Sequence, residues 1–75
     1  MNALEQQTIL HEAWVLTSLL EVSLDRVERL AKACHGRDPA ARERAIDAAG
    51  VIRDATERVV ALQKWVEGAR LSPGP

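Results

Sequence analysis

Apolar side chains recur at alternating spacings of three and four residues along two long stretches of this chain, and this pattern constrains the fold most. A spacing of two residues, which a half-buried β-strand needs, is not sustained anywhere. The seam of the first stretch consists of Leu10, Ala13, Thr17, Leu20, Leu24, Val27, Ala31 and Cys34. The seam of the second consists of Ala41, Ala45, Ala48, Ile52, Ala55, Val59, Leu62, Val66 and Ala69. The sequence therefore predicts an all-α protein with two amphipathic helices.

Signals that begin and end helices lie at only a few places. Asn2, followed three residues later by Glu5, resembles a capping box and predicts the start of the first helix. Gly36 suits the left-handed position after a helix end. Asp38 and Pro39 suit the N-cap and the first position of a second helix. One short turn therefore separates the two helices.

These signals predict helices over about residues 3–35 and 39–70, joined by a turn at residues 36–38. Because the helices are nearly equal in length and the turn is short, we expect an antiparallel hairpin. The hairpin forms one domain over residues 1–71, and residues 72–75 are expected to form a flexible tail.

Gly50 leaves one alternative open within the second helix. Glycine in a helix interior costs about 1 kcal/mol relative to alanine, so Gly50 could mark a kink or a break. The apolar pattern passes through Ala48, Ile52 and Ala55 without a change of phase. This continuity favours an unbroken helix.

Nine seam residues, most of them large, are expected to form the hairpin core. They are Leu10, Ala13, Leu20, Leu24, Val27, Ile52, Val59, Leu62 and Val66. The first helix carries more apolar surface than this seam uses, because Ile9, Leu16 and Leu30 widen it on one side and further residues extend it around the back. One neighbouring helix cannot cover that whole surface.

The excess apolar surface predicts a homodimer, most simply two hairpins that form a four-helix bundle. The expected dimer or partner interface consists of Trp14, Val15, Leu19, Val22, Val60 and Trp65. The sequence leaves open whether the two hairpins pack parallel or antiparallel.

Chain length leads to the same expectation. A core within 75 residues is usually marginal without a disulfide, a metal or an association partner. Cys34 is the only cysteine, and together with His11 and His35 it supplies too few ligands for a closed zinc site. Self-association therefore remains, with a metal-linked dimer through His11 as a minor alternative.

No motif indicates catalysis. His11 and Glu12 resemble the start of a zinc-protease helix, but that motif needs a second histidine where Val15 stands. Cys34 and His35 are adjacent, and adjacent helical side chains diverge by about 100° and cannot act together. We therefore expect a protein that is not an enzyme, with no catalytic residues, no metal and no cofactor.

Charge and hydropathy exclude several partners. The chain has 10 Lys and Arg against 11 Asp and Glu, so no overall basic field attracts nucleic acid or an anionic membrane. The longest apolar run, Ala13 to Leu16, is far shorter than the roughly 20 residues of a membrane span. The N-terminal residues lack the basic start and apolar stretch of a secretory signal, and a lone thiol suits a reducing compartment. We expect a cytoplasmic protein.

The charged residues near the turn allow two interpretations. The favoured one is a solvated surface with ion pairs four residues apart, such as Asp25 with Arg29, Glu28 with Lys32 and Asp54 with Arg58. The alternative is an RNA-binding dimer, although no aromatic residue stands among the arginines to stack on bases. Its contact residues would be Arg26, Arg29, Arg37, Arg42 and Arg44.

The two-helix plan, the opening Met1-Asn2-Ala3-Leu4-Glu5 and the glycine-containing turn resemble the needle-subunit co-chaperones of type III secretion. The plan also resembles the small phage-encoded anti-activators and inhibitors that bind host transcription regulators or motility ATPases. Both resemblances imply a partner-binding role. The expected function is a homodimeric interaction module that binds another protein and modulates or inhibits it.

Overall fold

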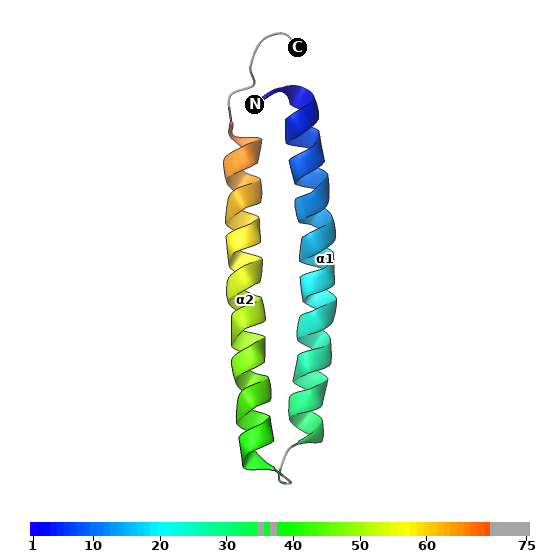
Figure 1. The fold of residues 1–75 in the computed structure, drawn as a ribbon, viewed down its shortest axis with the longest axis vertical. Coiled ribbons are helices and arrows are strands. Elements are labelled where there is room, and N and C mark those ends of the chain that lie inside the picture. Colours follow the sequence, from blue (N-terminus) through cyan, green and yellow to red (C-terminus); the bar gives the residue numbers. More distant parts are fainter. Residues whose placement is uncertain (35, 37, 70–75) are drawn as a thin grey trace.

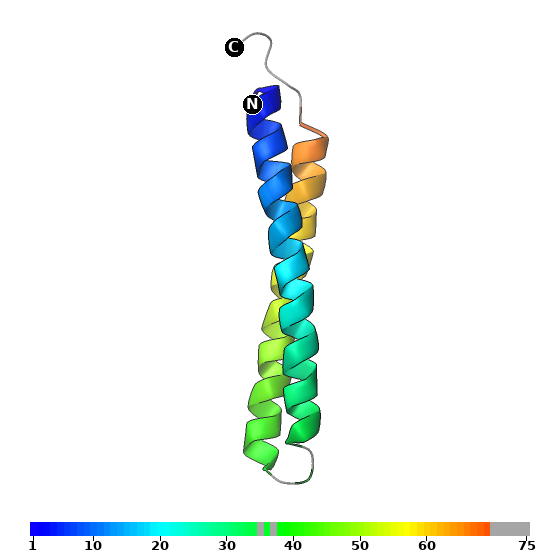
Figure 2. The same cartoon turned by 90° about the vertical axis from the view of Figure 1, so that its right-hand side faces the viewer.

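The chain is an antiparallel helical hairpin in the computed structural model, which describes all residues except 35, 37 and 70–75. Helix α1 spans Ala3–Ala33 and helix α2 spans Pro39–Glu67. They lie side by side along their full length, and the described residues contain no strand (Figures 1 and 2). The predicted all-α fold class and the two-helix hairpin are confirmed.

Side-chain caps begin both helices where the sequence predicts. Asn2 Oδ1 accepts a hydrogen bond from the Glu5 main-chain N–H at 2.8 Å, and Asn2 Nδ2 donates to Glu5 Oε1 at 3.1 Å. Asp38 Oδ1 accepts from the main-chain N–H groups of Ala40 and Ala41 at 3.1 and 3.2 Å. These bonds satisfy N–H groups that have no partner within the first turn of a helix.

Both helices end earlier than predicted. Helix α1 ends at Ala33, and Cys34 caps it by donating its N–H to the Leu30 oxygen at 3.1 Å. Helix α2 ends at Glu67, where the N–H of Gly68 bonds to the Lys64 oxygen at 3.1 Å. A glycine that follows a basic last turn is a common helix end, so Gly68 is the local signal for this end, which the predicted boundary at residue 70 does not use. The predicted tail at residues 72–75 lies outside the described residues.

Two glycines behave as the sequence indicates. Gly36, in the turn, adopts a φ of 75°, a left-handed conformation that favours glycine. Helix α2 runs through Gly50 without a break, and Gly50 is exposed. The continuous second helix is therefore confirmed.

Small residues dominate the contact between the helices. Among the described residues, the buried apolar side chains are Ala13, Ala45, Ala49 and Val66. Alanine at a helix contact allows the two axes to approach closely. Every residue of the predicted seam of α1 is buried or half-buried, so that seam is confirmed.

The predicted seam of α2 needs a correction. Ala45, Ile52, Val59 and Val66 face α1 as expected, and Ala41, Ala55 and Ala69 of the alternate row are half-buried. Ala48 and Leu62 are exposed, the latter by 47%, although Leu62 was predicted in the core. A further row, which was not predicted, also faces α1 and consists of Ala49, Thr56 and Gln63.

A search for apolar residues misses this row because two of its members are polar. The Thr56 hydroxyl is satisfied within its own helix, since Oγ1 donates to the Ile52 oxygen at 2.8 Å. Thr17 does the same in α1 by donating to the Ala13 oxygen at 2.8 Å. Once its hydroxyl is bonded in this way, threonine can occupy a half-buried contact position at little cost.

Candidate interaction surface

The hairpin buries its small side chains and leaves its large ones exposed. Trp14 is 63% exposed, Trp65 68% and Val51 70%, whereas the buried residues in the described part of the chain are three alanines and one valine. The other large apolar residues with substantial exposure are Leu4, Leu16, Leu19, Val22, Leu30, Ile46 and Leu62. Surface of this kind marks interaction sites when it is contiguous. The arrangement of these exposed apolar residues around the hairpin therefore decides whether they form an interaction site.

The seam between the helices separates two broad faces. One, which we call the apolar face, carries two apolar hollows. The hollow near the open end is lined by Thr8, Ile9, Glu12, Ala13, Leu16, Val59 and Leu62. The hollow near the turn is lined by Val27, Leu30, Cys34, Ala41, Arg44, Ala45 and Ala48.

Heptad spacing extends the apolar face beyond its hollows. Residues seven apart on a helix share an edge, and residues three apart lie side by side. Leu19 lies three residues beyond Leu16, and Val51 and Trp65 lie three beyond Ala48 and Leu62. We define the apolar face as Ile9, Leu16, Leu19 and Leu30 of α1 with Ala41, Ala48, Val51, Leu62 and Trp65 of α2.

The opposite side, which we call the mixed face, is more polar. Its hollow near the turn is lined by Glu28, Ala31, Lys32, Ile46, Ala49 and Arg53, and Arg42 lies beside it. Glu28 Oε1 accepts a hydrogen bond from Arg53 Nη2 at 2.9 Å. Glu28 thus pairs across the helices with Arg53, whereas the sequence predicted a pair with Lys32.

Trp14 belongs to the mixed face. It lies two heptads before Glu28 on the same edge of α1. Its indole packs near the His11 ring, with the two ring centroids 6.4 Å apart and the planes tilted by 30°. Trp14 is therefore an exposed aromatic residue on the side of the hairpin away from the two apolar hollows.

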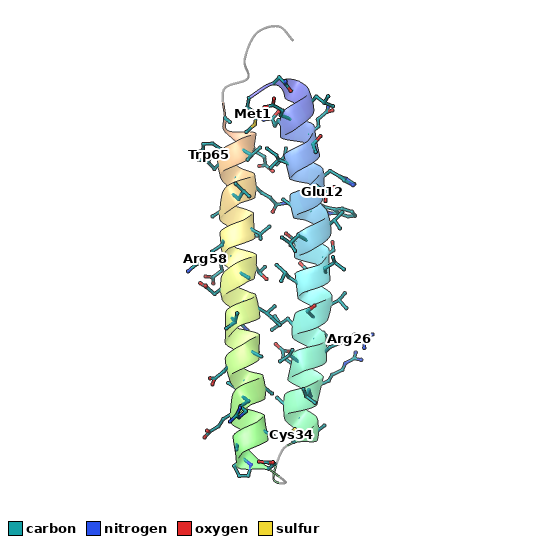
Figure 3. The ribbon with its side chains drawn as sticks, viewed as in Figure 1. Met1, Glu12, Arg26, Cys34, Arg58 and Trp65 are labelled. Atoms are coloured by element: carbon teal, nitrogen blue, oxygen red, sulfur yellow. The ribbon has the colours of Figure 1, made fainter. Side chains whose placement is uncertain are left out.

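The predicted interface residues do not share one surface. Leu19 and Trp65 belong to the apolar face, and Figure 3 shows Trp65 on the edge of α2 away from α1. Trp14 and Val60 belong to the mixed face, because Val60 lies two heptads after Ile46. The remaining two, Val15 and Val22, lie one heptad apart on the outer side of α1, opposite its seam.

The apolar face thus gathers residues that were not predicted to act together. Leu16, Leu30, Val51 and Leu62 join Leu19 and Trp65 there. The heptad row of Ile9, Leu16 and Leu30 was visible in the sequence as a widening of the first seam. Its counterpart on α2 was hidden, because Leu62 and Ala48 were assigned to the contact between the helices.

The arginines near the turn are also dispersed. Arg42 borders the mixed face, whereas Arg44 lines the apolar hollow near the turn. Arg29 pairs with Asp25 at 3.0 Å, as predicted, and Arg26 projects from the outer edge of α1 (Figure 3). Arg37 lies outside the described residues. The four described arginines therefore do not form one basic surface.

The described residues offer little for chemistry. No group of three or more His, Cys, Asp or Glu side chains among them could hold a metal ion. Cys34 is half-buried beside the apolar hollow near the turn. Neither α1 nor α2 is apolar over a length sufficient to span a membrane.

No family model matches this chain, and no similar protein was found among curated proteins or among solved structures.

Proposed function

We propose that this protein is a non-enzymatic protein–protein interaction module, a homodimeric helical hairpin that binds and modulates another protein. The observation that carries the proposal is that the hairpin buries small side chains and leaves its large apolar side chains exposed. The hairpin hides alanines, while Trp65 and Val51 remain 68% and 70% exposed. Burying such side chains is the main favourable term in association, at about 25 cal/mol per Å² of apolar area.

Chain size supports self-association. A hairpin of 75 residues with an alanine-rich interior has little apolar burial to offset the entropy lost on folding. A second copy placed on the apolar face would bury Leu16, Leu62 and Trp65 of both chains. The dimer would then contain the larger core that one hairpin lacks, in the manner of a four-helix bundle.

A second protein would use the surface that the dimer leaves free. Trp14 is 63% exposed on the mixed face, next to His11. An exposed tryptophan with polar neighbours is typical of a binding hot spot. The partner would dock a helix or a groove against this surface, and the protein would then stabilise or sequester one state of its target.

The architecture also supports a finer proposal. Small helical hairpins of the co-chaperone or phage-inhibitor type bind their targets without catalysis, and the present chain would act in the same way. Its partner would be a protein with an apolar groove able to receive Trp14. A cytoplasmic setting, where the lone thiol Cys34 stays reduced, is part of this proposal.

Sedimentation equilibrium of the full chain tests the dimer. We expect twice the chain mass of 8.3 kDa at micromolar concentration. The variant Trp65→Ala should shift the equilibrium toward monomer, whereas Trp14→Ala should leave it unchanged. A folded monomer at tens of micromolar would overturn the homodimer.

Capture from the source cell with the same two variants tests the partner. Trp14→Ala should lose the captured protein while it keeps the dimer mass. If Trp14→Ala captures the same protein as the unmodified chain with equal yield, the mixed face is not the partner site.

A further inference from the structure

We infer that the second copy docks on the apolar face in the inverted direction, so that the turn of each hairpin covers the open end of the other. This inference rests on the proposed homodimer and adds its orientation and contact residues. It follows from the distribution of size and charge along the apolar face.

Side-chain size changes along the apolar face from one end to the other. The half near the open end carries Leu16, Leu62 and Trp65, all large and exposed. On α2, the half near the turn carries the small residues Ala41 and Ala48. Stable interfaces interdigitate large side chains with small ones across the contact. Along α2, large side chains therefore meet small ones when two copies run in opposite directions.

Charge is distributed in the same self-complementary way. Glu12, Leu19 and Arg26 follow one another at intervals of one heptad and so form a single row along α1. Glu12 lines the hollow near the open end, and Arg26 lies toward the turn. Leu19, between them, lies next to the middle of the helix Ala3–Ala33. Reversing the row about Leu19 therefore exchanges an acidic position for a basic one.

The proposed dimer has a twofold axis at the level of Leu19. This axis runs between the two apolar faces and across the helices, at right angles to their length. Such an axis places α1 against α1 of the second copy and α2 against α2. Glu12 of each copy then lies at the level of Arg26 of the other, which gives two equivalent ion pairs. Leu19 of one copy lies at the level of Leu19 of the other.

The contacts between the helices set the corresponding levels on α2. Gln6 bonds to the Val66 oxygen, and Ala13 and Val59 share a hollow, so each α2 residue has a defined level on α1. With the axis at Leu19, Trp65 of one copy lies at the level of Ala41 of the other. Leu62 then lies at the level of Arg44, between Ala41 and Ala48. The largest side chain of α2, Trp65, thus meets one of its smallest.

Packing in the same direction lacks this match. It would place Leu62 of one copy near the level of Ile9 of the other at the open end, so that two large side chains meet there. It would also bring Arg26 of one copy near the level of Arg44 of the other. Like charges therefore oppose this arrangement.

The available area suits a stable dimer. A helix of 31 residues is about 46 Å long, and two helices side by side are about 20 Å wide. This whole side of the hairpin therefore offers roughly 900 Å², close to the about 800 Å² that each partner contributes to a standard interface. Both mixed faces, each with its Trp14, then point outward on opposite sides of the dimer.

Charge reversal in trans tests the orientation. Glu12→Arg and Arg26→Glu each create two like-charge contacts in the inverted homodimer, and each should weaken it roughly tenfold. When the two variants are mixed, both contacts are complementary again, so the heterodimer should regain the unmodified affinity. The doubly substituted chain should regain it as well. Equal affinity for the mixture and the separate variants would overturn the inverted arrangement.

Cross-linking gives a second readout in a Cys34→Ser background. Leu19→Cys should join two copies through a short bismaleimide, because the two positions meet at the axis. Leu30→Cys is the matched control, since it is similarly exposed on the same face but its two copies lie at opposite ends of the inverted dimer. Dimer mass with cross-linking at Leu30→Cys and none at Leu19→Cys would overturn the orientation and leave the homodimer standing. A folded monomer in sedimentation would overturn both.

Discussion

Gln6 Nε2 donates a hydrogen bond to the main-chain oxygen of Val66 at 2.9 Å, which joins the first turns of α1 to the last turn of α2. This bond is part-buried and sits at the open end of the hairpin, far from the turn that links the helices covalently. Val66 is itself 1% exposed, the most buried residue described. The two helices are therefore held together at both ends.

Removing this bond should loosen the open end. We expect Gln6→Ala to lower the free energy of unfolding by about 1 kcal/mol, the net value of a typical hydrogen bond. Amide hydrogen exchange in the last turn of α2 should accelerate. Gln7→Ala is the control, because Gln7 is exposed and neighbouring in sequence. Equal effects of the two substitutions in urea titrations would show that the bond contributes nothing.

The corrected seam of α2 predicts where the hairpin resists larger side chains. Ala49 packs against α1 and only 5% of its surface is exposed to solvent. Ala49→Leu should therefore force the helices apart and destabilise the hairpin by about 1 to 3 kcal/mol. Ala61 is exposed on the outer side of the same helix, and Ala61→Leu should change stability by less than about 0.5 kcal/mol. Thermal unfolding followed by circular dichroism measures both. If Ala49→Leu leaves stability unchanged, Ala49 does not pack against α1.

Substitution by alanine should change the stability in opposite directions at Gly50 and at Gly36. A Cβ added at Gly50 meets no atom within 4 Å, and the helix there is regular, so Gly50→Ala should stabilise the protein by about 0.5 to 1 kcal/mol. Gly36 has a φ of 75°, which alanine adopts only with strain, so Gly36→Ala should destabilise. Midpoints of denaturant unfolding for the two variants test this. A destabilising Gly50→Ala would indicate that the helix is not continuous there.

The ion pair between Arg53 and Glu28 should contribute little. Its side chains are 56% and 45% exposed, and such pairs contribute about 0 to 1 kcal/mol because water and salt screen them. We expect Arg53→Ala to lower stability by no more than this amount, with the difference from the unmodified chain vanishing in molar salt. Parallel unfolding curves at low and high ionic strength make the comparison. A loss that persists in high salt would mean that the aliphatic stem of Arg53, rather than its charge, carries the effect.

Local sequence signals were sufficient for the helices and their starts. Asn2 and Asp38 accept hydrogen bonds from main-chain groups two or three residues away, so the information is contained in a few neighbouring positions. The turn at Gly36 is equally local, because it depends on one backbone conformation. The end of α2 at Gly68 was also available locally and was overlooked.

The residues of the interaction surface could not be selected by composition alone. Leu62 and Gln63 are neighbours, and the apolar one was assigned to the core although the polar one faces α1. Adjacent helical positions differ by about 100°, so such an error moves a large side chain from the contact to the open face. Three of the six predicted interface residues, Trp14, Val22 and Trp65, lie on different sides of the hairpin for the same reason. The sequence pattern does not fix how each helix is rotated about its own axis relative to the other.

Sequence by itself determined that this chain forms two amphipathic helices, where they begin and where it turns, because capping, glycine geometry and heptad spacing act over a few residues. The tertiary structure decided which side of each helix meets the other, and therefore which apolar residues are left together on one face. That choice depends on the fit of Ala13, Ala45 and Ala49 between two close helices. Shape complementarity of this kind arises only when both partners are present.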